Sequence, residues 1–267
     1  MTQPGVMEAE FRAKRAAGRK LLVPYITGGL AGWQDAVRAA AAAGADAIEI
    51  GIPFSDPVMD GPIIQQASQR ALEAGATPVS ILQDARSLDV SIPLAVMTYY
   101  NTVHHAGMER FAAQLIDAGI VAAIVPDLPL EESGPWCSAA DAAGIETVML
   151  AAPTAPDERL PRIAARSRGF VYSVGLLGVT GERTQLAGTA TELAARLKRI
   201  TDVPVLVGVG VSNAAQALEA TAVADGVVMG ASVVRRLLNP KDSETGPDAV
   251  GAYINEVRRA LDSARRT

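Results

Sequence analysis

Short apolar runs alternate with amphipathic stretches along the whole chain, and this repeat restricts the fold more than any other feature. The runs are nearly continuous in apolar residues, which is typical of parallel strands covered on both faces. Strands that alternate with helices form a parallel sheet, and eight such units can close into a barrel. We predict strands at residues 21–27, 46–52, 94–100, 122–128, 146–152, 169–175, 204–210 and 225–231.

Helical stretches separate these strands, for example at residues 34–44, 63–75, 108–119 and 191–200. Glycines at which a helix can end in a left-handed residue are Gly44, Gly75, Gly119 and Gly144. The alternative is an open doubly wound sheet, which usually carries GxGxxG after its first strand, but TGGLAGW stands there. The sequence therefore predicts an α/β protein, a single (β/α)8 TIM barrel over residues 1–267. An extra helix at residues 5–18 is expected to close its N-terminal end.

The composition fits this fold and excludes several classes of protein. The 267 residues suit one barrel of ~250 residues, and 49% of them are hydrophobic but only 4% aromatic. The net charge is −5 without a basic run, so we expect no nucleic-acid partner. Two histidines and one cysteine are too few for a histidine-built metal site or an intramolecular disulfide. No signal peptide or membrane-spanning stretch is apparent, which predicts a cytoplasmic protein.

The second predicted strand places an acidic side chain in the barrel. Side chains alternate along it, so Ile48 and Ile50 suit the helix layer and Glu49 points into the barrel mouth, with room beside Ala47 and Gly51. Active sites of such barrels lie at the C-terminal ends of the strands. Burial raises the pKa of a carboxyl group toward the range useful for proton transfer. The alternative is an ion pair, but no predicted strand supplies a cation, which favours a functional Glu49.

Two aspartates follow this strand in a loop rich in proline and glycine, a kind of segment that often carries function. A structural role is open for each of them. Asp56 precedes Pro57 and can start a turn, and Asp60 precedes Gly61 and can cap a helix that begins near Pro62. The spacing alone does not decide between catalysis and capping for Asp60.

A phosphate site is predicted after the last two strands, which end in GVGVSN (208–213) and MGAS (229–232). Barrels often bind phosphate with these loops and the N-terminus of a short helix. Glycines let backbone N–H groups approach the anion, so no lysine is required. The alternative is that the glycines only turn strands into helices, but two such turns in the expected places favour phosphate.

The residues alone do not decide the role of two further features. The connection at residues 178–190 is long and polar, as a mobile lid or an ordinary surface loop would be. Four residues on predicted strands are candidates either for lining a pocket for an aromatic ligand or for filling the barrel: Tyr25, Met97, Tyr99 and Tyr172.

Together these stretches resemble the tryptophan synthase alpha subunit along nearly the whole chain. The strongest motif is IEIGIPFSDPVMDGPIIQ (48–65), which is similar to the family's signature around two catalytic carboxylates. The other matching motifs follow in the family's order: LVPYITGG (22–29), MTYYN (97–101), PDLPLEES (126–133), GVTG (178–181) and GVGVS (208–212).

The resemblance implies a lyase of L-tryptophan biosynthesis that splits indole-3-glycerol phosphate into indole and glyceraldehyde 3-phosphate. It implies Glu49 and Asp60 as the catalytic pair, residues 178–190 as the lid, and no metal or cofactor of the chain's own. It also implies a partner, the pyridoxal-phosphate-dependent beta subunit, in an α2β2 heterotetramer. The residues it implies around the substrate and its phosphate are Tyr172, Thr180, Gly181, Gly210 and Gly230.

The sequence departs from the family pattern in three places. The family usually reads Gly-Ser after the eighth strand, whereas this chain has Gly230-Ala231, so backbone contacts to phosphate would survive without one hydroxyl. Residues 29–31 read Gly-Leu-Ala in place of Gly-Asp-Pro, in a loop that could bear on the partner interface, and Met59 replaces a usual small residue. None of these changes removes a catalytic group.

Three other functions compete with this hypothesis. The first is a stand-alone lyase with the same site outside tryptophan biosynthesis, which would turn over quickly without a beta subunit. The second is a silent barrel that binds phosphate ligands and regulates a partner, which the intact Glu49 and Asp60 disfavour. The third is another phosphate-binding barrel enzyme, such as an isomerase, which the carboxylate pair also disfavours.

Overall fold

The computed structural model describes residues 3–175, 188–208, 210–240 and 245–264. Eight strands form a closed barrel in which each pairs with the next and β8 returns to β1, and the β1–β2 and β8–β1 pairs are parallel. All eight predicted strands are present, and the open sheet is excluded. They are β1 (Leu21–Thr27), β2 (Ile48–Gly51), β3 (Leu94–Met97), β4 (Ala122–Ile124), β5 (Glu146–Ala151), β6 (Val171–Ser173), β7 (Val205–Val207) and β8 (Gly226–Met229).

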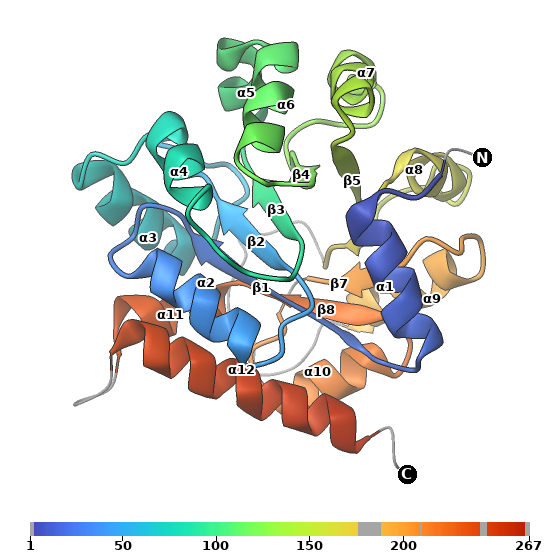
Figure 1. Cartoon of the computed structure of the whole chain (residues 1–267). Coiled ribbons are helices and arrows are strands. Elements are labelled where there is room, and N and C mark those ends of the chain that lie inside the picture. Colours follow the sequence, from blue (N-terminus) through green and yellow to red (C-terminus); the bar gives the residue numbers. More distant parts are fainter. Residues whose placement is uncertain (1–2, 176–187, 209, 241–244, 265–267) are drawn as a thin grey trace.

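Helices surround the barrel, and the long α12 lies beside α2 on its outside (Figure 1). The four glycines predicted at helix ends, from Gly44 to Gly144, all have positive φ. The helices are α1 (Val6–Ala16), α2 (Trp33–Ala42), α3 (Pro62–Glu73), α4 (Pro78–Ala85), α5 (Tyr100–Ala106), α6 (Met108–Asp117), α7 (Gly134–Ala143), α8 (Leu160–Arg166), α9 (Gly188–Lys198), α10 (Ala214–Thr221), α11 (Ala231–Leu238) and α12 (Gly246–Ser263).

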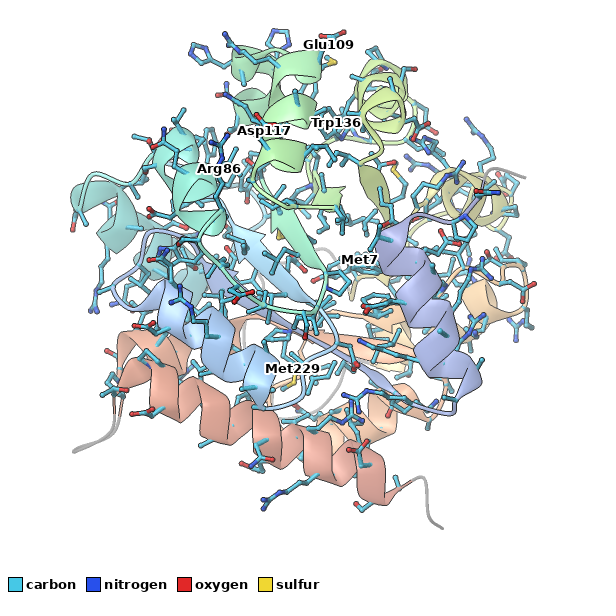
Figure 2. All side chains as sticks on the ribbon, in the orientation of Figure 1. Met7, Arg86, Glu109, Asp117, Trp136 and Met229 are labelled. Carbon is cyan, nitrogen blue, oxygen red and sulfur yellow. The ribbon has the colours of Figure 1, made fainter. Side chains whose placement is uncertain are left out.

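The apolar residues form two clusters, one between strands and helices and one inside the barrel. Ile48 and Ile50 belong to the outer cluster and Ala47 to the inner one, as the alternation along β2 predicts. In the outer layer Trp136 lies between α6 and α7, 5.9 Å from the ring of Phe111 (Figure 2). The barrel is therefore filled by side chains, which leaves its C-terminal mouth as the place for a site.

Helix α1 closes the N-terminal end of the barrel. Met7 and Phe11 are fully buried in the inner cluster, and Met7 lies on the side of α1 that faces the strands (Figure 2). The carboxylate of Glu146, at the start of β5, accepts the N–H groups of Met7 at 2.7 Å and Glu8 at 2.9 Å. A strand residue thus satisfies the first free N–H groups of α1, which a helix cannot satisfy itself.

Two buried aspartates fix the same end of the barrel. Asp46, just before β2, accepts the N–H of Leu22 at 2.9 Å and pairs with Arg19 at 2.7 Å. Asp225, just before β8, accepts the N–H of Val205 at 2.9 Å and pairs with Lys198 at 2.8 Å. Each carboxylate joins the beginnings of two neighbouring strands, so this end is held by polar contacts as well as packing.

Two searches of the described residues bear on function. They contain no helix long and apolar enough to cross a membrane. They also contain no group of three or more His, Cys, Asp or Glu side chains placed to hold a metal ion.

Candidate active site

Glu49 lies on β2, in register with Tyr25 of β1 and Ala95 of β3. The residue is 1% exposed, and neither carboxylate oxygen has a hydrogen-bond partner in the described part of the chain. Burial, together with a smaller effect of the negative charge of Asp60, raises the pKa of Glu49 to about 8. The alternative prediction, that Glu49 forms a buried ion pair, is therefore wrong for the described residues. At neutral pH Glu49 carries a proton that it can donate.

Two tyrosines occupy the space around Glu49. The hydroxyl of Tyr25 lies against Gly51 and the ring of Tyr172 against Gly208, where in each case a Cβ atom would collide with the tyrosine. Burial raises the pKa of Tyr172, and the charge of Glu49 adds to this effect. The room expected beside Gly51 is thus filled by Tyr25, and these glycines permit bulky aromatic side chains inside the barrel.

Asp60 is not the cap of α3. The residue before this helix is Gly61, which makes no side-chain cap, and the backbone oxygen of Asp60 accepts a hydrogen bond from Gln65 Nε2 at 2.8 Å. The side chain of Asp60 instead accepts a hydrogen bond from the hydroxyl of Tyr99. Burial raises the pKa of Asp60 to about 6, and the Tyr99 hydrogen bond opposes this rise. The capping interpretation is wrong, and Asp60 is ionised at neutral pH.

Tyr99 lies at the start of a helix, not on a strand. The prediction of a strand over residues 94–100 is wrong at its end, because β3 stops at Met97 and Tyr99 is the residue before α5. The Tyr99 hydroxyl accepts the N–H of Met59 at 2.9 Å, and its ring stacks on Phe54 at 5.1 Å. Tyr99 therefore holds the loop that carries Asp60 from two sides.

Sequence reasoning missed Asp127, which supports Tyr99. Its Oδ1 atom accepts the N–H of Tyr100 at 2.8 Å, at the beginning of α5. An acceptor at this position stabilises a helix N-terminus. The signal for it is the aspartate of the PDLPLEES motif, which lies shortly after the end of β4. A linear pattern does not reveal its partner 27 residues away.

Both predicted phosphate loops lead from a strand into a helix. After β7, Gly210 has a φ of +82°, and Asn213 caps α10 by accepting the N–H of Gln216. After β8, Gly230 precedes α11 and Ala231 is its first residue. Each loop thus ends at a helix N-terminus, whose free N–H groups and dipole favour an anion.

The remaining predicted site residues divide into two groups. Met97 is partly buried at the C-terminal end of β3, at the mouth of the barrel. Thr180, Gly181 and most of the predicted lid lie outside the described residues, and only 188–190 are described, at the start of α9.

Comparison with known proteins gives the same family at the levels of sequence and structure. The model of the family "Tryptophan synthase alpha chain" matches residues 11–262. The chain is 42% identical to the tryptophan synthase alpha chain of Thermobifida fusca, over 98% of this chain and 99% of that one. It is 41% identical to the alpha chain of Streptomyces coelicolor, over 93% and 94% of the two chains.

Solved structures show the same likeness. A chain in a structure of Mycobacterium tuberculosis tryptophan synthase superposes with a TM-score of 0.88 at 35% identity, covering 97% of this chain and 99% of that one. The tryptophan synthase alpha chain of Legionella pneumophila superposes with a TM-score of 0.88 at 28% identity, covering 98% of both chains.

Proposed function

The chain belongs to the tryptophan synthase alpha chain family, and from this premise we propose that Glu49 and Asp60 are the catalytic carboxylates of its reaction. The chain is a lyase of tryptophan biosynthesis that cleaves indole-3-glycerol phosphate into indole and glyceraldehyde 3-phosphate. The observation that carries the assignment is Glu49 itself, a fully buried carboxyl group without a hydrogen-bond partner among the described residues, on the inner face of the barrel.

Glu49 has the protonation state that the first step requires. Cleavage needs a proton at C3 of the indole ring, which turns the ring into a leaving group. With a pKa of about 8, Glu49 donates this proton at neutral pH and becomes a carboxylate. The carboxylate then takes the proton of the hydroxyl on the attached carbon as the C–C bond breaks and the aldehyde forms. Glu49 ends the cycle protonated, so one residue serves both steps.

Asp60 is suited to stabilise the charge that appears during the first step. Protonation at C3 places positive charge on the indole ring, and its N–H becomes a stronger hydrogen-bond donor. With a pKa of about 6, Asp60 is ionised at neutral pH and accepts this hydrogen bond. The Tyr99 hydroxyl holds both the carboxylate and the Met59 N–H beside it, which orients Asp60 before substrate binds.

The other residues of the proposed site bind substrate rather than transfer protons. Tyr25, Met97 and Tyr172 line the space for the indole ring, since they lie on β1, β3 and β6 around Glu49. The backbone N–H groups near Gly210, Gly230 and Ala231 bind the phosphate. Ala231 offers no hydroxyl there, so backbone contacts carry this end of the site. Thr180 is proposed to line the substrate pocket and Gly181 to lie near the phosphate, as the family resemblance implies.

The chain works with the beta subunit of tryptophan synthase, and the matching Mycobacterium tuberculosis structures are of tryptophan synthase. We propose the α2β2 heterotetramer as the form of this complex and the cytoplasm as its location. The chain needs no cofactor of its own for the two proton transfers described above. A stand-alone lyase is not favoured, because the relatives of this chain are tryptophan synthase alpha chains.

The test is indole release from indole-3-glycerol phosphate, with and without added beta subunit. We expect slow release by the wild-type chain that the beta subunit accelerates. Glu49→Gln should reduce kcat by at least about a hundredfold, the usual contribution of a general acid–base group, and Asp60→Asn should also reduce it. Glu158→Gln, at an exposed position, is the control. An active Glu49→Gln variant would contradict the assignment, and fast turnover that ignores the beta subunit would point to a stand-alone lyase.

A further inference from the structure

A tyrosine of α12 and an arginine of α11 connect the two loops to which we assign the substrate phosphate. We propose that Tyr253 and Arg236 form a brace that sets the relative position of these loops, and so act as positioning residues for phosphate binding. This inference rests on the proposed function, because that function places the phosphate between the loops.

Tyr253 holds the loop after β7. Its hydroxyl donates a hydrogen bond to the backbone oxygen of Ser212 at 2.7 Å. Tyr253 is 3% exposed, so its ring is fixed by packing and its hydroxyl has little freedom. Ser212 lies two residues after Gly210, whose positive φ turns the chain. Tyr253 therefore fixes the position of this loop from the helix layer behind it.

Gln216 fixes the same loop from its other side. Its Oε1 atom accepts both the N–H of Ser212 at 2.7 Å and the hydroxyl of Ser212 at 2.9 Å. The N–H and hydroxyl of Ser212 are thus engaged within the protein, and its backbone oxygen is engaged by Tyr253. Ser212 serves as the anchor of the loop, which leaves the binding of phosphate to the backbone of Gly210.

Arg236 connects Tyr253 to the second loop. The centre of its guanidinium lies 3.4 Å from the centroid of the Tyr253 ring, a cation–π contact. Its NH1 atom donates to the backbone oxygen of Ser232 at 2.7 Å, in the first turn of α11. Ser232 directly follows Ala231, the first residue of that helix. Arg236 thus holds the N-terminus of α11 and the face of Tyr253 at once.

The chemistry explains why both loops need a common support. A phosphate bound by backbone N–H groups requires them at fixed distances, because each hydrogen bond weakens steeply when its geometry is lost. Preorganised donors also avoid the cost of ordering a loop on binding. Because the phosphate takes no part in the bond cleavage or the proton transfers, a fault in the brace weakens substrate binding and leaves the proton transfers unchanged.

Tyr253→Phe tests the brace, because it deletes the hydroxyl and keeps the ring on which Arg236 lies. We expect the Kd of the full chain for glycerol 3-phosphate, measured by calorimetric titration, to rise about threefold to tenfold, the range expected for one hydrogen bond. The KM for indole-3-glycerol phosphate should rise by a similar factor, with kcat within about twofold. With indoleglycerol, which lacks the phosphate, the variant and the wild type should have equal kcat/KM.

Ser167→Ala is the matched control. It removes another buried hydroxyl that donates to a backbone oxygen, that of Phe170, at the N-terminal end of the barrel. We expect it to lower thermal stability without changing the Kd for glycerol 3-phosphate. Arg236→Met should raise the same Kd, and in combination with Tyr253→Phe the effects should not add, because the residues act on one support.

The outcomes separate this inference from the proposed function. If Tyr253→Phe lowers stability as Ser167→Ala does but leaves the Kd for glycerol 3-phosphate unchanged, the brace is overturned. The brace is also overturned if Tyr253→Phe lowers kcat/KM equally for indoleglycerol and indole-3-glycerol phosphate, or if the wild type does not bind glycerol 3-phosphate. If the wild type binds it but releases no indole, the proposed function fails while the brace is still decided by the Kd values.

Discussion

Single residues of the same chemical type perform different tasks here because their surroundings differ. Glu49 is enclosed by the barrel with no polar partner among the described residues, whereas Asp60 receives a hydrogen bond from Tyr99. Burial therefore raises the pKa of Glu49 to about 8 but that of Asp60 only to about 6. Between these values Glu49 is an acid and Asp60 is an anion, which is the combination the reaction requires.

This difference predicts a bell-shaped pH profile. In kcat/KM we expect an acid limb near pH 6, where Asp60 gains a proton, and an alkaline limb near pH 8, where Glu49 loses one. Because the charge of Asp60 raises the pKa of Glu49, Asp60→Asn should abolish the acid limb and move the alkaline limb to lower pH. Steady-state rates from pH 5 to 9.5 measure both limbs. An alkaline limb unmoved by Asp60→Asn would show that the two groups do not interact.

The same burial predicts that Glu49 costs stability at high pH. Its pKa in the folded chain, about 8, lies above the ordinary value of 4.5, so the folded state binds more protons between these values. The free energy of unfolding should therefore fall as pH rises through this window, being fully retained below about 4.5. The side chain in Glu49→Gln cannot titrate, so the stability of this variant relative to wild type should increase from pH 5 to pH 9, on the order of 4 kcal/mol. Urea unfolding at both pH values checks this, and a constant difference would contradict it.

At the scale of elements, local patterns predict strands and helices better than they predict contacts between them. All eight strands and the helix before β1 follow from apolar runs and glycine positions, although β4 ends at Ile124 and not at residue 128. The strand end at Met97 is missed because Thr98 and Tyr99 are residue types that favour strands, while the backbone already turns into α5.

The residues around Asp60 show why the rest of the site is not predictable. The burial that identifies Glu49 follows from alternation along one strand. The hydroxyl that orients Asp60 belongs to Tyr99, and the carboxylate that supports α5 belongs to Asp127. These contacts depend on which loops meet at the barrel mouth, and that follows only from the closed fold.

The cap on α1 belongs to this scale as well, and Glu146→Ala tests it. The substitution leaves the buried N–H groups of Met7 and Glu8 without the carboxylate that accepts them. We expect a loss of about 1–3 kcal/mol in the free energy of unfolding, the usual cost of such groups, with KM unchanged. Glu158→Ala, at an exposed position, should change stability by less than about 0.5 kcal/mol. Equal losses in the two variants would show that Glu146 does not anchor α1.

At the scale of the whole molecule, the residues that stabilise the barrel and the residues proposed to act on substrate lie at opposite ends. The buried carboxylates at the N-terminal end, Asp46, Asp225 and Glu146, accept N–H groups of α1 or of neighbouring strands. At the other end Glu49 has none among the described residues, and its pKa is displaced as a result. An unpaired buried charge destabilises a fold, and Glu49 avoids this cost at neutral pH because it carries a proton.

Asp46→Ala tests whether the N-terminal end of the barrel contributes to stability without contributing to catalysis. The fully buried Asp46 accepts hydrogen bonds from Arg19, Arg258 and the N–H of Leu22, and its removal leaves the buried Arg258 without this partner. Breaking such a pair should lower the free energy of unfolding by about 3–5 kcal/mol, with kcat of the folded fraction within about twofold of wild type. Asp35→Ala removes an exposed ion pair with Arg38 and should cost less than about 1 kcal/mol. Urea unfolding and indole release on the same samples give both quantities. A loss of kcat in Asp46→Ala under conditions where it is fully folded would mean that the two ends of the barrel are coupled, because Arg19, Leu22 and Arg258 contact Asp46 at the N-terminal end.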